Sequence, residues 1–133
     1  MKKILILGGT KYVGKALLRE LTKNNNYYVS VFSKHKVKEV LSIQGDRKDE
    51  LLLSRIVKND YDIIIDFICY CLPDAKKLIN ALKKNNKKPK IIFISSTYVY
   101  DQNACKDVYY ETDFNPISYI PSKLERENIS YED

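Results

Sequence analysis

The sequence opens with an apolar run, residues 4–7, that passes directly into a glycine-containing turn and then into a helical pattern. A strand, a tight turn and a helix in this order are typical of a parallel α/β sheet. Such a turn brings the backbone close to a pyrophosphate, and the following helix directs unpaired amides and a positive dipole end toward it. We therefore expect a dinucleotide site formed by Gly8, Gly9, Thr10, Lys11, Tyr12, Val13 and Gly14.

Lys11 occupies the middle of the spacing Gly8-x-x-Lys11-x-x-Gly14, where a third glycine is expected. Its side chain must either leave the turn or reach a phosphate of the ligand. Tight turns between a strand and a helix also use glycine for purely steric reasons. The turn alone therefore leaves a steric explanation open, and a second signal is needed.

Strand-like and helix-like segments alternate along the rest of the chain. Apolar and β-branched runs predict strands at residues 28–32, 40–43, 61–68 and 90–95, and helical spacing predicts helices at residues 13–23, 48–57, 74–82 and 118–128. Unbroken apolar cores at residues 63–65 and 91–94 indicate strands buried on both faces. The expected fold is α/β, a Rossmann-type parallel sheet of about five strands in the order 3-2-1-4-5 with helices on both faces. Its ligand crevice lies at the carboxyl ends of the strands.

Length and composition limit the kind of protein. A chain of 133 residues corresponds to about one domain. It contains no apolar stretch of about 20 residues that would span a membrane, and Met1-Lys2-Lys3 leads straight into the first strand rather than a signal peptide. We expect a soluble, cytoplasmic protein with no membrane partner. Three cysteines and one histidine do not form a recognisable ligand set, so we expect free thiols and no metal.

The formal net charge of +6 raises the question of a nucleic-acid partner. The positive residues are mostly lysines mixed with asparagines, as in residues 83–88. Such a run is typical of a solvated turn. We therefore favour a solvated turn for these lysines. The alternative is that they form a surface that binds an anionic ligand or RNA.

A second signal for a nucleotide site comes from hydroxyl groups and a lysine late in the chain. Tyr119 and Lys123 are four residues apart and share one face of a predicted helix, where the ammonium favours the phenolate and prepares it for proton exchange with a substrate hydroxyl. Ser95-Ser96-Thr97 directly follows the strand at residues 90–95, so its hydroxyls emerge at the carboxyl edge of the sheet. If the Tyr119–Lys123 spacing stood alone, an exposed pair without a catalytic role would be the simpler explanation. The hydroxyls of residues 95–97 at the sheet edge favour a functional pair.

Taken in order, these motifs resemble the short-chain dehydrogenase/reductase family, specifically its extended, NAD-dependent epimerase/dehydratase branch. The resemblance extends over nearly the whole chain. It rests on Gly8-Gly9-Thr10-x-x-x-Gly14, Gly45-Asp46-Arg47, the strand at residues 63–67, residues 95–100 and Tyr119-x-x-x-Lys123.

The resemblance implies a role for each matched position. Tyr119 would be the catalytic acid/base, Lys123 would tune it and hold the nicotinamide ribose, and Ser96 would hydrogen-bond the reacting oxygen. Thr97 is the alternative to Ser96. The residues expected to line the cofactor beyond the glycine turn are Asp46 and Arg47 at the adenine and Phe67, Ile68 and Cys69 along the wall.

Cofactor choice depends on the end of the second strand, where an acidic residue accepts hydrogen bonds from the ribose when the cofactor is NAD. Ser33 occupies that position, and Lys34, His35 and Lys36 follow it. A 2′-phosphate would meet positive charge and no carboxylate, which favours NADP over NAD. The simpler alternative is that these residues form a solvated loop, and His35 alone indicates no catalytic role.

Residues 1–133 are thus expected to form a single NAD(P)-binding Rossmann domain that lacks a carboxyl-terminal substrate domain. The resemblance implies an oxidoreductase-type epimerase, dehydratase or reductase that acts by hydride transfer on a sugar nucleotide or a related carbonyl or hydroxyl substrate. One alternative is a non-catalytic Rossmann module, either a redox sensor or an RNA-binding relative. A third interpretation is a fragment whose exposed last strand pairs with a second copy as a homodimer.

Overall fold

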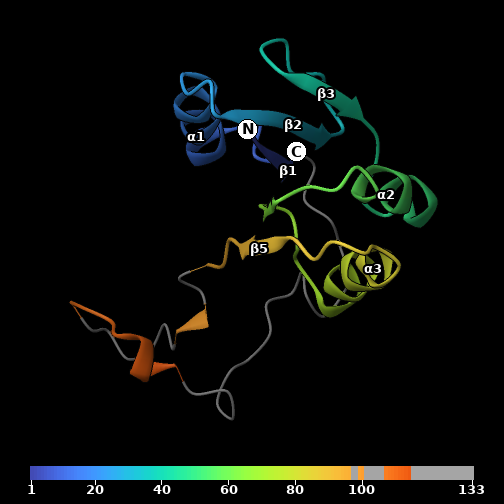
Figure 1. Cartoon of the computed structure of the whole chain (residues 1–133). Helices are drawn as coiled ribbons and strands as arrows, with labels where there is room; N and C mark the ends of the chain where they lie inside the picture. Colours follow the sequence, from blue (N-terminus) through green and yellow to red (C-terminus); the bar gives the residue numbers. More distant parts are fainter. Residues whose placement is uncertain (97–98, 101–106, 115–133) are drawn as a thin grey trace. The chain divides into compact units, whose positions relative to one another are not determined.

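The computed structural model describes residues 1–96, 99–100 and 107–114. They fall into two compact units, one comprising Met1–Ile94 and the other the described residues from Ser95 onward. The first unit contains a parallel sheet of five strands in the order β3-β2-β1-β4-β5, which confirms the predicted order 3-2-1-4-5 (Figure 1).

Each element predicted within residues 1–94 is present in the structure. The strands are β1 (Lys2–Leu7), β2 (Tyr27–Ser33), β3 (Leu41–Gln44), β4 (Ile63–Asp66) and β5 (Lys90–Phe93), and the helices are α1 (Tyr12–Thr22), α2 (Glu50–Val57) and α3 (Leu72–Lys83). The helix predicted at residues 118–128 lies outside the described residues.

All three helices begin one or two residues from their predicted starts: α1 begins at Tyr12 instead of residue 13, and α2 and α3 differ by two residues for local reasons. We expected the second helix from residue 48, but α2 begins at Glu50 because the Asp49 side chain accepts a hydrogen bond of 2.9 Å from the Leu52 amide and caps it. We expected the third helix from residue 74, but α3 begins at Leu72 because Pro73 is tolerated in a first turn. The third helix therefore starts closer to the end of β4 than the pattern predicted.

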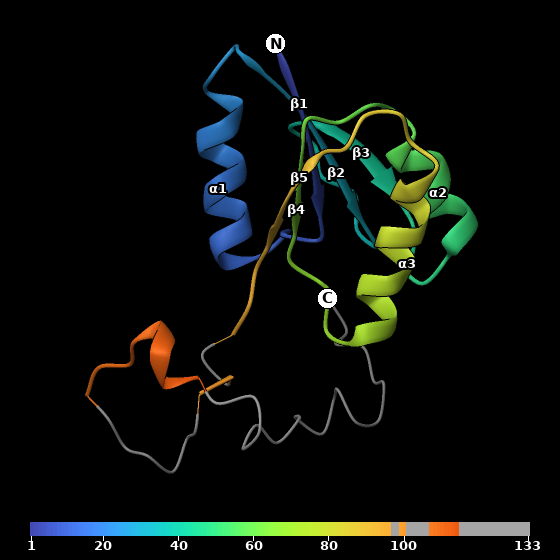
Figure 2. The same cartoon turned by 60° about the horizontal axis from the view of Figure 1, so that its bottom comes forward.

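Helices cover both faces of the sheet, as expected for a doubly wound fold. Figures 1 and 2 show α1 on one face and α2 and α3 on the other. Side chains at positions 4–7 of β1 are no more than 2% exposed, so the central strand is buried on both faces. The core on the α1 side includes Ile4, Ile6, Leu18 and Val31, and the core on the α2 and α3 side includes Leu5, Leu53, Ile64 and Leu78.

The fifth strand differs from the prediction that it is buried on both faces. Its apolar residues and the one that follows are 44%, 37%, 54% and 39% exposed, from Ile91 to Ile94. Within the described part of the chain β5 stands at the edge of the sheet and pairs with β4. A continuous apolar run predicts a buried strand, but burial also requires another layer of the protein to cover the strand. The described residues do not cover β5.

Among the described residues, no helix has the length and apolar character needed to cross a membrane. The described part of the second unit includes the 3₁₀ turn η3 (Glu111–Asp113), where the Tyr110 amide donates to the Asp113 carboxylate at 2.8 Å. The rings of Tyr100 and Tyr109 lie 5.2 Å apart between centroids in the same unit.

The glycine turn between β1 and α1 requires its glycines for two separate reasons. Gly8 and Gly9 have φ angles of +74° and +70°, in the left-handed region that side chains disfavour. Gly14 lies in α1, and an added Cβ there would overlap backbone atoms of Gly9. The turn is therefore folded so tightly against the first helical turn that no side chain fits between them.

This packing predicts the effect of replacing Gly14 with alanine. Alanine in a helix interior normally gains about 1 kcal/mol over glycine. Because the new methyl group would meet Gly9 backbone atoms that cannot simply rotate away, we expect Gly14→Ala to lower the free energy of unfolding by about 1–3 kcal/mol. Urea denaturation followed by circular dichroism measures this change.

The matched control is Lys15→Ala, one residue further along the same helix, where the side chain is exposed. Its effect should stay within about 0.5 kcal/mol. A stabilising effect of Gly14→Ala would show that the turn does not approach the helix as closely as the structure indicates.

Candidate functional site

The carboxyl ends of four strands meet at one edge of the sheet. Leu7 at the end of β1 is in register with Phe32 in β2 and with Asp66 in β4, and Ser33 is in register with Gln44 at the end of β3. The loops that follow these strands therefore emerge side by side. Together with Ser33 at the end of β2 and the first turn of α1, they contain every residue predicted to bind the cofactor within the first unit.

The first turn of α1 is open to a ligand. Lys11 precedes the helix without forming a side-chain cap, and no acidic residue lies in the first turn. Tyr12 and Val13 are 89% and 71% exposed, so their side chains leave the turn, and Tyr12 has a φ of 44°, which is costly for an aromatic residue. The positive end of the helix dipole and the absence of a competing carboxylate together suit an anionic group.

The end of β2 carries a hydroxyl in place of a carboxylate. Ser33 is buried, and its Oγ donates to the carbonyl of His35 at 2.5 Å, within its own loop. Lys34 is half-buried, and its Nζ lies 3.9 Å from Oδ2 of Asp46, which follows β3. The structure thus brings together Lys34 and Asp46, two residues predicted separately for the adenosine end of the site.

Arg47 lies in the interior, whereas the resemblance had implied a place at the adenine edge. It is 5% exposed, and its Nη1 donates to both carboxylate oxygens of Asp66 at 2.5 and 2.6 Å. Its Nη2 donates to the Asp74 carbonyl at 3.1 Å. The guanidinium is therefore engaged by buried partners, and of the predicted pair only Asp46 is exposed beside the cofactor loops.

Asp66 and Asp74 were not singled out from the sequence, although one signal was present. Asp66 closes the apolar run Ile63-Ile64-Ile65, and a carboxylate at the end of a buried strand requires a cation or hydrogen-bond donors. Arg47 and Arg55, which both precede Asp66 in the sequence, were available to supply that charge. Only the tertiary structure shows that Arg47 pairs with Asp66 instead of lying exposed at the adenine edge.

The predicted wall of the site packs directly on the glycine turn. A Cβ at Gly8 would lie 2.5 Å from Cγ2 of Ile68, and one at Gly9 would lie 2.9 Å from Cδ2 of Phe67. Cys69 lies beside them, and burial, reinforced by the nearby Asp66 charge, raises the pKa of its thiol to about 11. The thiol is therefore protonated at neutral pH and contributes a weakly polar surface rather than a nucleophile.

The three predicted catalytic residues belong to a different part of the chain. Ser96 is exposed in the second unit, and its carbonyl accepts a hydrogen bond of 3.3 Å from the Val99 amide. Tyr119 and Lys123 lie outside the described residues, as does Thr97, the alternative to Ser96. Their catalytic roles remain predictions.

Two curated proteins are similar to this chain over almost its whole length. A UDP-glucose 4-epimerase of Lactobacillus helveticus is 27% identical over 151 residues, which cover 96% of this chain and 46% of that protein. The chloroplast stem-loop binding protein of 41 kDa b of Arabidopsis thaliana is 27% identical over 147 residues, covering 96% of this chain and 38% of that protein. The chain thus spans less than half the length of the curated relatives it matches. No protein-family model matches the sequence.

Solved structures show the same fold. A UDP-Glc/GlcNAc 4-epimerase of Campylobacter jejuni superposes with a TM-score of 0.72 at 20% identity, over 90% of this chain and 44% of that one. A short-chain dehydrogenase/reductase of Veillonella parvula, in complex with NADP, gives a TM-score of 0.63 at 18% identity, over 74% of this chain and 49% of that one. The chain is thus similar in sequence to a UDP-glucose 4-epimerase, and it shares the fold of solved epimerase and short-chain dehydrogenase/reductase structures.

Proposed function

We propose that residues 1–94 bind a nicotinamide dinucleotide, with its pyrophosphate at the glycine turn. The carrying observation is the tight glycine turn at the end of β1, which packs so closely on Ile68, Phe67 and the first turn of α1 that no side chain fits at Gly8, Gly9 or Gly14. The turn lies at the carboxyl end of the central strand of a 3-2-1-4-5 sheet, the usual ligand position in such folds. The first turn of α1, which has no side-chain cap and no acidic residue, follows the turn directly and suits the phosphate charge.

Within this proposal NADP is preferred over NAD. Ser33 offers no carboxylate to a ribose, because its hydroxyl donates to the His35 carbonyl. Lys34 supplies a cation beside Ser33. The ion pair between Lys34 and Asp46 is long and partly exposed, so Asp46 holds the Lys34 ammonium only weakly. The Veillonella parvula neighbour, whose structure contains NADP, supports a nicotinamide dinucleotide as the cofactor.

For the whole protein we propose the function of an epimerase, dehydratase or reductase acting on a sugar nucleotide or a related substrate. The similarity to UDP-glucose 4-epimerase supports this substrate class. Ser96 would hydrogen-bond the reacting oxygen, Tyr119 would exchange its proton, and Lys123 would favour the phenolate. When bound, the dinucleotide would supply hydride transfer. Residues 1–133 would then be one NAD(P)-binding domain of such an enzyme.

Calorimetric titration of the whole chain with NADP, NAD and their reduced forms tests this proposal. We expect binding in the millimolar range or tighter, with NADP bound more tightly than NAD. Lys34→Met should weaken NADP binding about fivefold, the contribution of one partly exposed charge pair, and leave NAD binding unchanged.

Lys58→Met is the matched control, because Lys58 is an exposed lysine that follows α2, away from the end of β2. It should alter neither affinity. Absence of binding to all four dinucleotides would refute the cofactor proposal, and equal effects of Lys34→Met on NADP and NAD would refute the role of Lys34 in recognising the 2′-phosphate.

A second candidate function is RNA binding, favoured by one specific observation. The Arabidopsis thaliana relative, similar over 96% of this chain, is named a stem-loop binding protein. The net charge of +6 is compatible with a polyanionic partner. The two candidates do not exclude each other, since a dinucleotide and an RNA can use different surfaces of one chain.

Filter retention of a radiolabelled stem-loop RNA distinguishes this candidate. If RNA binds through lysine–phosphate contacts, the affinity should fall about tenfold or more between about 50 and about 200 mM salt. A single-stranded RNA of the same composition is the control for stem-loop recognition. Absence of retention at the lower salt concentration would exclude RNA binding.

A further inference from the structure

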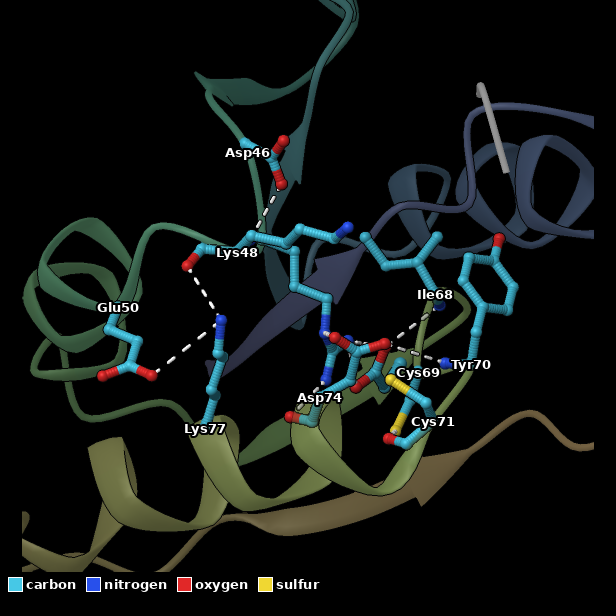
Figure 3. Close-up of polar contacts among 11 residues, drawn as sticks. Asp46, Lys48, Glu50, Ile68, Cys69, Tyr70, Cys71, Asp74 and Lys77 are labelled. Carbon is cyan, nitrogen blue, oxygen red and sulfur yellow. Dashed lines mark hydrogen bonds and ion pairs between the residues drawn. The ribbon is translucent and has the colours of Figure 1, made fainter. Parts of the chain in front are cut away.

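A buried cluster of three charged residues joins three loops at the carboxyl edge of the sheet. Arg47 comes from the loop between β3 and α2, Asp66 ends β4, and Asp74 lies in the first turn of α3. All three are buried. Arg47 donates to both oxygens of the Asp66 carboxylate and to the Asp74 carbonyl, and its Nε lies 3.9 Å from Oδ1 of Asp74. The cluster is shown in Figure 3.

Each carboxylate in the cluster also holds a backbone amide. Asp66 Oδ1 accepts from the Ile68 amide at 3.0 Å, and Asp74 Oδ2 accepts from the Tyr70 amide at 3.1 Å (Figure 3). Both amides belong to residues 67–71, which connect β4 to α3 and are called here the wall segment. The Ile68 and Tyr70 amides of the wall segment therefore donate to two carboxylates. The Arg47 guanidinium lies beside both carboxylates and offsets part of their negative charge.

The wall segment in turn packs against the glycine turn. Ile68 occupies the space that a side chain at Gly8 would need, and Phe67 does the same at Gly9. The Gly8 amide donates to the Phe32 carbonyl at 2.8 Å, so the turn is also tied to β2. A displacement of Ile68 would remove the surface against which Gly8 is packed.

From these contacts we propose that Asp74 and Arg47 are positioning residues, which hold the wall segment against the glycine turn through the Tyr70 and Ile68 amides. The cluster would set the shape of the dinucleotide site without touching the dinucleotide. This inference rests on the proposed function in one respect, namely that the turn is the cofactor site. The mechanical coupling between Asp74 and Gly8 is independent of any ligand.

Asp74 is the residue to change, because its link to Arg47 is the looser of the two. The ion pair between Arg47 and Asp66 stays complete when Asp74 is replaced, which protects the fold. Asp74→Ala removes the acceptor of the Tyr70 amide, whereas Asp74→Asn keeps a side-chain oxygen there. Both remove the charge at the start of α3, so their difference isolates the hydrogen bond.

Hydrogen exchange by NMR on the cofactor-free protein measures the coupling directly. We expect Asp74→Ala to speed exchange of the Tyr70 and Gly8 amides about tenfold relative to the Val31 amide in the core of β2, the order expected for one charge-assisted hydrogen bond. Asp74→Asn should remain within about twofold of the original protein, which is the expected rescue by a similar acceptor.

Lys77→Met is the control on the same helix. Lys77 contacts the Lys48 carbonyl in the loop before α2 at 3.2 Å and Glu50 of α2 at 3.9 Å, and neither contact involves the wall segment (Figure 3). It should leave Gly8 exchange unchanged. The proposal is overturned if Asp74→Ala leaves the Gly8 amide protected, or if Asp74→Ala and Asp74→Asn change it equally.

Fluorescence titration with NADPH then tests the consequence for the site. Asp74→Ala should raise the Kd about tenfold, while Asp74→Asn and Lys77→Met should keep the original value. An unchanged Kd for Asp74→Ala would overturn the link to the site. If the original protein bound neither NADPH nor NADH, the proposed function would fail, and the exchange of Gly8 would still decide whether Asp74 positions the turn.

Discussion

The ion pair between Arg47 and Asp66 connects parts of the chain that are distant in sequence. It links the loop after β3 to the end of β4 and, through Asp74, to the start of α3. Because these charges are withdrawn from water, leaving one of them without its partner costs about 3–5 kcal/mol. Only an arrangement that keeps all three loops in place satisfies them together. The position of the wall segment, and so one side of the candidate site, depends on this arrangement.

On the other side of the site the constraint is steric rather than electrostatic. The backbone of the glycine turn touches Ile68 in one direction and the first turn of α1 in the other, and both contacts exist only because Cβ atoms are missing. The result is a tight backbone turn beside a neutral thiol and two apolar side chains, followed by a first helical turn that contains no carboxylate. Such an environment favours an anionic group because it supplies dipoles and little competing negative charge.

Most of the fold could be predicted from the sequence because each element is encoded locally. Residues 4–7 and 63–65 are continuously apolar, as is typical of strands buried on both faces, and all of them are buried except Ile63, which is half-buried. Residues 91–94 have the same pattern but are exposed, since the pattern cannot show whether a covering layer is near. The helix boundaries moved by up to two residues where a cap at Asp49 or a proline at position 73 decided them.

The sequence by itself determined the strand–turn–helix unit, the parallel sheet and its strand order. Hydrophobic periodicity and glycine positions can be read directly from the sequence, and the alternation of strands and helices they reveal is typical of a fold with this strand order. Tertiary structure alone decided that Arg47 turns inward to Asp66 and Asp74, and that Lys34 meets Asp46. Charge pairing depends on which residues distant in sequence come within a few ångströms of one another, and on whether water is excluded there. No spacing along the chain encodes either quantity.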